Sequence, residues 1–360
     1  MQVSVENKRS LSKKKGFLFW VIALTIILAG TIVGAIAVGS TYIEPGEVYK
    51  VLLNRLTNGT LFSGVGEVMT QNIIWEIRFP RVILGAICGA GLAICGVLMQ
   101  CVTKNPIAEP YILGISSGAS CGAVFVIVLG GVSSVGINSI TSGAFVGSLV
   151  SGILVFAIGT QMGKTTSTTR LVLTGMAIST IFSALTNLLI YSAKNSNQAK
   201  NALFWTVGSL GGAKWDVLLI PFLVLLIVMI VAFTMSKSLD ILLLGDDSAI
   251  ILGINVKLIK SIILILATLL TSTLVAITGA IGFIGLVVPH ICRTIAGSDH
   301  KKLIVLSALI GSIFLIASDV LARGLFPPVE IPIGIITSLI GGPFFLYLIS
   351  KKNYTFGGRD

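Results

Sequence analysis

Long stretches without Asp, Glu, Lys or Arg dominate the pattern of the chain. They cover residues 16–43, 82–103, 110–163, 171–193, 217–236, 261–292, 303–318 and 331–350. Because a helix needs about 20 apolar residues to cross the hydrocarbon layer, most stretches predict one span each. Two stretches predict two spans each: 110–163 contains turn-like residues at 130–139, and 261–292 breaks at Gly279 and again before Pro289. The pattern therefore predicts an all-α membrane protein with about ten transmembrane helices.

Lys and Arg are distributed unevenly among the segments that join these spans. An even number of spans places both termini on one side. If that side is the cytoplasm, 17 of the 25 Lys and Arg residues lie in inner segments. Cytoplasmic loops carry the excess of Lys and Arg, so both termini are predicted to be cytoplasmic. The expected organisation is a basic tail at 1–16, a transmembrane domain at 17–350 with its longest inner segment at 236–257, and a second tail at 351–360.

The composition agrees with a membrane protein and excludes other classes. Hydrophobic residues make up 54% of the chain and charged residues 11%, against roughly 25% charged in a soluble domain. A soluble enzyme and a disordered chain are both excluded. The net charge of +11 is explained by topology, without nucleic acid. The cysteines are odd in number, lack a CxxC pair and are read as packing residues, not as a disulfide framework or metal site: Cys88, Cys95, Cys101, Cys121 and Cys292.

Glycine pairs at GxxxG spacing recur along the spans. This spacing lets transmembrane helices approach closely. Each pair alone is a weak signal, but together they predict a compact bundle. The pairs are Gly30/Gly34, Gly85/Gly89, Gly118/Gly122, Gly143/Gly147 and Gly159/Gly163.

Two motifs resemble catalytic or nucleotide-binding motifs, but their sequence context excludes both functions. Residues 114–118 (GISSG) match a nucleophile elbow, but an apolar helix follows and no strand precedes, and the histidines lie far away in the sequence. Residues 159–165 (GTQMGKT) have three residues where a phosphate-binding loop has four between its glycines. The chain is therefore predicted to have no catalytic residues and no ATPase site, so ATP-driven transport would need another subunit.

An ion-coupled carrier is the alternative from a different class. Such carriers usually bury ionisable side chains near the middle of the membrane. The nearest candidate is Asp319, which lies towards the outer end of its span with Arg323 four residues on. A local i,i+4 ion pair explains both residues, so secondary transport is disfavoured.

Three polar segments are candidates for function. Residues 78–81 (RFPR) put two arginines at the predicted outer start of the second span, with Pro80 in the first turn. They are interpreted either as interfacial anchors or as a cationic docking point for an acidic partner. Residues 103–110 form a loop stiffened by two prolines, and composition alone predicts only a rigid turn. Residues 236–257 predict two short amphipathic helices that dock on a partner protein or lie on the lipid surface.

With these segments the chain resembles the FecCD-like permease subunits of ABC importers for iron-siderophores, haem and cobalamin. The resemblance covers roughly residues 17–350. Its most specific parts are RFPR at 78–81, NPIAEPYILGISSGA at 105–119, STTRLVLTG at 167–175, GAIGFIGLVVPHICR at 279–293 and EIPIGIITSLIGGPFFLYLI at 330–349. The resemblance implies the ten-helix bundle of a type II importer, as in the cobalamin importer permease, with 17–350 as the permease domain.

The resemblance also implies roles for particular residues. Outer arginines would bind glutamates on a substrate-binding protein. A cytoplasmic gate, built from the loop after the second span and the loop between the fourth and fifth, would close the pathway. The segment 244–253 would couple to the ATPases. The docking residues would be Arg78, Arg81 and Arg323, the gate residues Asn105, Ile107, Thr168 and Thr169, and the coupling residues Asp246, Asp247, Ala249, Leu252 and Gly253.

The function implied is translocation of an iron(III)-siderophore across the cytoplasmic (inner) membrane of a prokaryote by alternating access. Cobalamin or haem is the alternative cargo. The expected partners are a second permease copy or related chain, two cytoplasmic ABC ATPases that use ATP and Mg²⁺, and an extracytoplasmic substrate-binding protein. The chain itself is expected to bind no cofactor and no metal.

Overall fold

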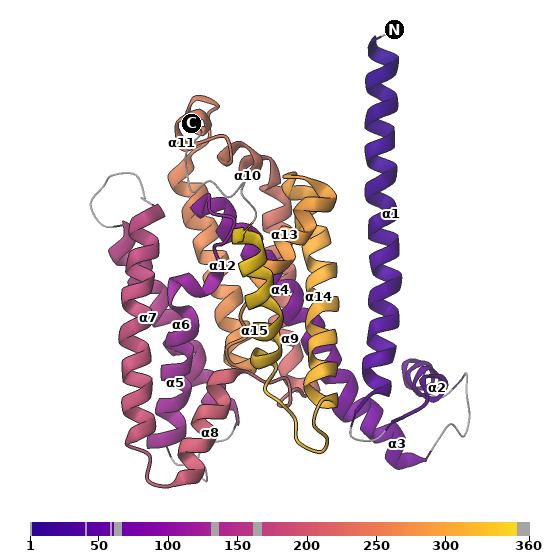
Figure 1. Cartoon of the computed structure of the whole chain (residues 1–360), viewed down its shortest axis with the longest axis vertical. Helices are drawn as coiled ribbons and strands as arrows, with labels where there is room; N and C mark the ends of the chain where they lie inside the picture. Colours follow the sequence, from indigo (N-terminus) through magenta and orange to yellow (C-terminus); the bar gives the residue numbers. More distant parts are fainter. Residues whose placement is uncertain are drawn as a thin grey trace.

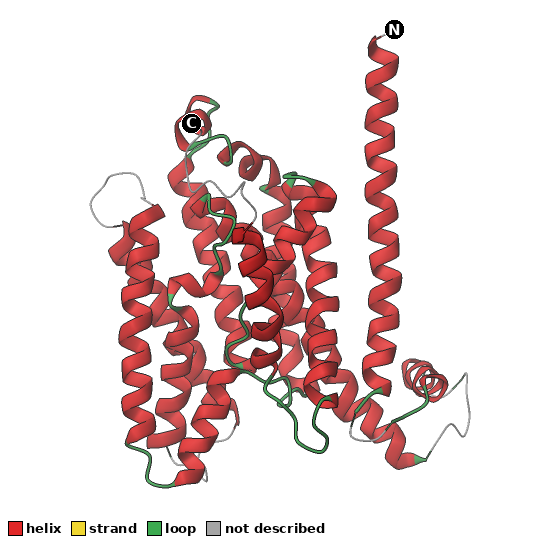
Figure 2. Cartoon of the chain, in the orientation of Figure 1, coloured by secondary structure: helices red, strands yellow, loops and turns green. Residues whose placement is uncertain are grey.

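The computed structural model describes residues 2–39, 42–57, 60, 67–130, 137–160 and 168–350, and these contain helices and loops but no strand (Figure 2). The long helices stand side by side as one bundle (Figure 1). They are α1 (Gln2–Ala37), α2 (Pro45–Leu56), α3 (Val68–Asn72), the π-helical turn η1 (Ile73–Arg78), α4 (Phe79–Thr103), the 3₁₀ turn η2 (Pro110–Leu113), α5 (Ile115–Leu129), α6 (Ile137–Thr160), α7 (Thr168–Tyr191), α8 (Ser196–Val207), α9 (Trp215–Thr234), α10 (Ser236–Leu242), α11 (Asp246–Ile251), α12 (Val256–Thr278), α13 (Ile284–Ala296), α14 (His300–Gly324) and α15 (Ile333–Ser350).

Ten apolar helices confirm the predicted architecture of an all-α membrane protein. Among the described residues, eight helical segments are long and apolar enough to cross a membrane, and α5 and α13 are shorter apolar helices. The stretch 110–163 divides into α5 and α6, and the stretch 261–292 divides at Gly279, which has a positive φ of 69°. In Figure 1, α1 begins and α15 ends at the end of the bundle that carries α10 and α11. The backbone of the predicted N-terminal tail continues α1 as helix from Gln2.

The helices differ strongly in how much they are surrounded by others. Within the continuous helix Val68–Thr103, 89% of the 18 consecutive residues with the highest hydropathy are buried. The corresponding share in α1 is 6%. Helix α4 packs against α9, α12, α13 and α14, and α1 stands at one edge of the bundle (Figure 1). A helix that is apolar on all sides is expected in the centre of a bundle. The centre of this bundle is therefore α4, and the functional segments are positioned around its two ends.

The predicted break before Pro289 is wrong, because Pro289 lies inside α13. Proline has no N–H to donate to the carbonyl four residues back, which here is Gly285. The side chain of Gln100 on α4 replaces that donor, with Nε2 lying 3.0 Å from the Gly285 oxygen. A side chain 185 residues away therefore allows the helix to continue, and no pattern near Pro289 indicates it.

The second span begins earlier than predicted. A continuous helix runs over Val68–Thr103, so the arginines of residues 78–81 do not lie at its N-terminus. Pro80 does follow the start of α4, but α4 continues directly from the π-helical turn η1. Arginines at a helix N-terminus would oppose the helix dipole, but these two lie inside a continuous helix, so this conflict does not arise.

Glycines bring α5 and α6 into backbone contact, as the GxxxG spacing predicted. A Cβ added to Gly122 would lie 2.0 Å from the Gly143 oxygen, and one added to Gly118 would lie 2.4 Å from the Gly147 oxygen. The same spacing at Gly30 and Gly34 has a different result, because nothing lies within 4 Å of an added Cβ there. Spacing alone therefore did not identify which glycine pairs pack within the chain.

Replacing Gly122 by Ala is expected to destabilise the bundle by about 1–3 kcal/mol, the usual cost of forcing extra atoms into a packed interior. Gly34→Ala is the matched control, since its added methyl group meets open space. Thermal unfolding of the two purified variants makes the comparison. Equal melting temperatures for both variants would show that the α5–α6 contact is not as close as described.

Candidate functional site

A cluster of charges lies at the end of the bundle opposite α10 and α11, where α4, α14 and the loop after α14 meet. Arg81 is its centre. Its guanidinium contacts the Asp319 carboxylate, with Nη2 2.9 Å from Oδ1, and the Glu330 carboxylate, with Nη1 2.9 Å from Oε2. Asp319 also lies 3.0 Å from Nε of Arg323, which confirms the predicted i,i+4 pair. The two acidic groups therefore hold two of the three predicted docking arginines.

Arg78 and Arg323 donate hydrogen bonds to backbone carbonyls at the end of α1. Arg78 Nη1 donates to the carbonyl oxygens of Ile36 and Ala37 at 2.6 and 3.0 Å. Arg323 donates to the carbonyl oxygens of Ala35 and Val38 at 3.0 and 2.7 Å. The last carbonyls of a helix have no partner within the helix and favour positive charge. The two arginines thus cap α1 and fasten it to α4 and α14.

Binding-protein docking by these arginines stays a prediction. Arg78 and Arg323 are 5% and 6% exposed, and the side chain of Arg81 is 11% exposed. The Glu330 side chain is half exposed. Of the three arginines, Arg81 is therefore the most accessible to a carboxylate of a docking protein. That carboxylate would meet Glu330, which already pairs with Arg81.

An aromatic cluster borders the same end of the bundle. The rings of Trp75, Phe79 and Trp215 lie 5.1–5.4 Å apart, and Nε1 of Trp215 donates to the Trp75 carbonyl at 3.0 Å. Trp is enriched at the level of the lipid headgroups. The cluster agrees with the prediction that this end of the bundle lies near a membrane surface.

The first predicted gate pair lies in the loop between α4 and η2. The Asn105 side chain accepts a hydrogen bond from the Ile107 amide at 3.1 Å, which makes a tight turn. Ile107 packs against the apolar cluster that joins α13 to α15. The loop is thus a tight turn that also packs against helices far along the chain.

The second predicted gate pair begins α7. Thr169 is exposed, and Thr168 is the first residue of the helix, with its side chain outside the described part of the chain. Among the described residues, no hydrogen bond joins Thr169 to Asn105 or Ile107. A joint gate of these two pairs therefore stays a prediction.

Residues 236–257 fold as the two predicted short helices, α10 and α11. Gly253 has a φ of +81°, and the Ile254 amide donates to the Ala249 carbonyl at 2.9 Å, so a Schellman motif ends α11. The N-cap is Gly245, with no side-chain capping bond, so Asp246 and Asp247 lie in the first turn and are not caps. There their charge still favours the helix dipole.

Asp246 ties α11 to two other elements. Its carboxylate lies 2.9 Å from Nζ of Lys104, at the end of α4, and 2.6 Å from Nζ of Lys260 on α12. Partial burial alone would raise the pKa of Asp246, but hydrogen bonds and charge from Lys260 and Lys104 lower it below its ordinary value. Asp246 is therefore ionised at neutral pH, and it links the segment to the start of the loop that carries Asn105.

The outward face of α11 is apolar. Ile250, Ile251 and Leu252 are 54%, 85% and 57% exposed, whereas Ala249 is buried beneath them. Three adjacent exposed aliphatic side chains at a polar end of a bundle are typical of a surface that contacts a protein or lipid partner. The geometry matches a docking surface.

Glu109 is a buried acid that sequence reasoning did not single out. It follows the Asn105 turn and lies at the start of α13, where the amides of Phe283 and Leu286 hydrogen-bond its carboxylate. Its Oε1 is buried without a hydrogen-bond partner among the described residues. Burial raises the pKa of Glu109 to about 7, against the opposing effect of those two amides. The signal in the sequence was an acid between two prolines, but its surroundings come from Phe283 and Leu286 of a distant segment.

Glu109→Gln is expected to flatten the pH dependence of stability between about pH 4.5 and 7. The raised pKa means that the folded state binds the proton more tightly than the unfolded state. Its contribution to the free energy of unfolding is therefore fully present below about pH 4.5 and declines as the pH rises through 7. Thermal unfolding from pH 5 to pH 8, with Glu330→Gln as a control, measures the slope. Parallel profiles for Glu109→Gln and the unaltered chain would contradict the assignment.

Known proteins are similar to this chain over nearly its whole length. The sequence profile of the FecCD transport family matches residues 24–351. The cobalamin import system permease protein of Halobacterium salinarum is 40% identical over 80% of this chain and 76% of its own length. The Fe(3+)-citrate import system permease protein YfmE of Bacillus subtilis is 38% identical over 95% of this chain and 98% of its own. A solved inward-facing structure ascribed to a metal-chelate type of ABC transporter has a TM-score of 0.79 at 29% identity, over 92% of this chain and 98% of that one.

Proposed function

Because the chain belongs to the FecCD transport family, we propose that it is the permease subunit of an ABC importer that carries an iron(III)-siderophore complex inward. The observation that supports this most is the extent of the family match: residues 24–351 include the second half of the first apolar span, the other nine apolar helices and every candidate segment. The chain is a multi-pass membrane protein. Its place in this proposal is the cytoplasmic membrane of a prokaryote.

The inner end of the bundle supports a partnership with cytoplasmic ATPases. The exposed aliphatic residues of α11 form the proposed contact, and Asp246 joins α11 to Lys104 and Lys260. A displacement of α11 would pull on the end of α4 and on the first turns of α12. Lys104 directly precedes the loop of Asn105 and Ile107, so the movement would reach the proposed gate. The ATPases would bind and hydrolyse ATP with Mg²⁺, while the permease would supply the pathway and its alternating access.

The outer end supports docking of an extracytoplasmic substrate-binding protein. Charge-assisted pairs between arginine and carboxylate add orientation as well as affinity. Arg81 would receive an acidic residue of that protein in competition with Glu330, whereas Arg78 and Arg323 would hold α1 and the docking surface in place. The assembly would contain two permeases, either two copies of this chain or this chain with a related one.

Two cargo classes have support from the relatives. The Fe(3+)-citrate relative matches this chain over nearly its full length, which favours a ferric chelate. The Halobacterium relative has the higher identity, and its name states cobalamin, which makes cobalamin the second candidate. Haem is a third cargo for the same machinery.

Uptake measurements in cells that lack and then re-express this chain test the proposal. Radio-iron siderophores, ferric citrate, haem and labelled cobalamin are supplied in parallel, with the neighbouring ATPase and binding-protein genes present. The proposal predicts that uptake of a ferric chelate returns with the chain. Restored cobalamin or haem uptake alone would contradict the cargo and keep the permease role. Restoration of none, in cells where the chain reaches the membrane, would contradict both.

A further inference from the structure

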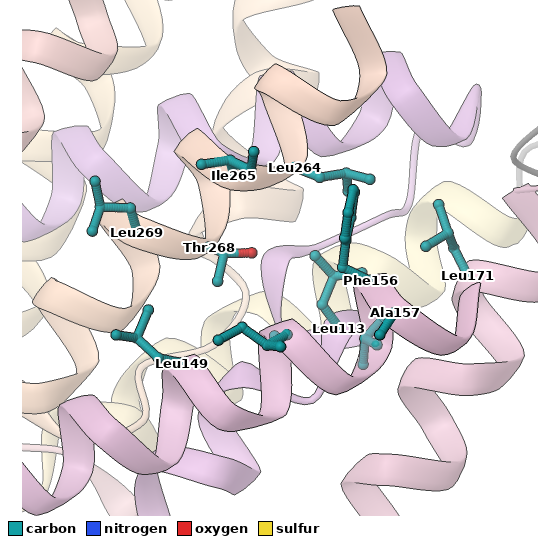
Figure 3. Close-up of a pocket in the computed structure, with 12 residues that line it drawn as sticks. Leu113, Leu149, Phe156, Ala157, Leu171, Leu264, Ile265, Thr268 and Leu269 are labelled. Carbon is teal, nitrogen blue, oxygen red and sulfur yellow. The ribbon is translucent and has the colours of Figure 1, made fainter. Parts of the chain in front are cut away.

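An apolar pocket of about 320 Å³ lies between α6 and α12, with the start of α7 beside it. Figure 3 shows Leu264, Ile265, Thr268 and Leu269 from one helix and Leu149, Phe156 and Ala157 from another around a common space. Thr268 is the one lining residue with a polar side chain. The volume lies at the lower end of the range for small-molecule sites, about 300–1,000 Å³.

The pocket has a closed floor and an open rim. Leu113, Val155 and Leu171 form its floor and are 2–3% exposed, whereas Ile153 and Ile265 at the rim are 63% and 58% exposed. Gly152 and Thr268 mark the contact between α6 and α12, since a Cβ added to Gly152 would lie 2.5 Å from the Thr268 methyl carbon. The pocket surrounds this contact between two membrane-spanning helices. In a bilayer, the exposed rim residues of these two spanning helices would face lipid tails.

The chemistry of the lining excludes the transported chelate as occupant. A metal chelate carries polar oxygen or nitrogen atoms, and burying such atoms without hydrogen-bond partners is costly. A single hydrocarbon chain needs no such partners and fits a narrow apolar space. The lining therefore favours an acyl chain.

A positive charge lies above the pocket on the same face of α12. Lys257 precedes Leu264 by seven residues and Thr268 by eleven, which places all three on one helix face. The axial rise from Lys257 to Leu264 is about 10 Å, a span that a glycerol backbone and the first carbons of a chain would fill. Lys257 is exposed and makes no ion pair with the described residues, although it lines a pocket together with Asp246 and Asp247. Lys260, in contrast, is buried against Asp246.

We infer that this pocket binds one acyl chain of an anionic phospholipid from the inner leaflet, with the phosphate at Lys257. The apolar lining selects the chain, the open rim admits it from the bilayer, and the lysine selects the negative headgroup. Because α12 begins directly after the coupling segment, the lipid would support the helix to which Asp246 is tied. The inference does not depend on the cargo or on the partner ATPases.

Fluorescence quenching in lipid nanodiscs tests the site with the full chain. A tryptophan replaces Phe156 at the pocket, or Ala157 as a second reporter, and its emission is compared with that of the parent chain. The probes are phosphatidylglycerol and phosphatidylcholine brominated on their acyl chains, each titrated into unbrominated phosphatidylcholine. Ile153→Trp at the exposed rim reports ordinary contact with surrounding lipid.

The pocket reporters are expected to be half-quenched at an about fivefold lower fraction of brominated phosphatidylglycerol than of brominated phosphatidylcholine, the preference that one lysine near anionic lipid supplies. The rim reporter is expected to show a much smaller preference. Lys257→Gln should abolish the preference for phosphatidylglycerol at the pocket. Lys237 is an exposed lysine of α10, and Lys237→Gln should leave that preference unchanged. Three results would overturn the inference. The two lipids could quench the pocket reporters equally, or the preference could survive Lys257→Gln. The third result is that neither lipid reaches the pocket, because a second copy of the chain covers it.

Discussion

Replacing Asp319 by Asn is expected to lower the free energy of unfolding by about 3–5 kcal/mol, the usual cost of removing one partner from a buried ion pair. Asp319 is 2% exposed and lies against both Arg81 and Arg323. The amide of Asn keeps the size of the side chain but removes the negative charge. Two guanidinium groups would then share the half-exposed Glu330 as their remaining acidic neighbour in the cluster. The end of α1 would loosen as well, because Arg323 holds its carbonyls.

Glu330→Gln is the matched control for Asp319→Asn. It makes the same chemical change at the exposed carboxylate of the same arginine, where ion pairs contribute about 1 kcal/mol or less. Thermal and denaturant unfolding of both variants in one detergent or nanodisc measures the difference. Similar stabilities would mean that Asp319 does not organise the cluster.

Replacing Leu252 by Asp is expected to abolish ATP-driven uptake while leaving the fold intact. The Leu252 side chain is 57% exposed, so a carboxylate there remains solvated in the isolated permease. At a docked surface the same carboxylate would be buried without a partner, and central contacts of this kind typically contribute 2 kcal/mol or more, or about 30-fold in affinity. The measurements are ATPase co-purification and transport rate.

Asn255→Asp controls for the added negative charge. Asn255 caps α12 through its side-chain oxygen, which accepts from the Leu258 amide at 3.0 Å, and Asp preserves that acceptor. The control is expected to transport normally. Normal transport by Leu252→Asp as well would show that the apolar face of α11 is not the ATPase contact.

Local patterns were sufficient to predict most of the fold. Charge-free stretches identified the spans, and Gly279 and the turn-like residues 130–139 identified the divisions within two of them, because membrane helices must satisfy their hydrogen bonds internally. The short helices of residues 236–257 followed from two apolar runs, 239–244 and 249–252, that Gly245 separates, and from Gly253 after the second run. Each of these features acts within a few residues of the element that it determines.

The errors arose where distant residues decide the outcome. Pro289 remains inside a helix because Gln100 serves the Gly285 carbonyl. The sequence indicated positive charge at Arg78 but not that the carbonyls of Ile36 and Ala37 occupy its guanidinium. Glu109 was missed because burial against α13, and not its local sequence, sets its pKa. Patterns along the chain do not encode such contacts individually.

The energy source for uptake tests the central claim most directly. Uptake of the restored chelate is measured in cells that express this chain with its partner ATPase, with the same ATPase carrying a replaced P-loop lysine, and after an ionophore has collapsed the ion gradients under conditions that preserve cellular ATP. An ABC importer permease predicts that uptake stops with the altered ATPase and continues with the ionophore. Uptake that continues with the altered ATPase and stops with the ionophore would contradict the account and identify an ion-coupled carrier.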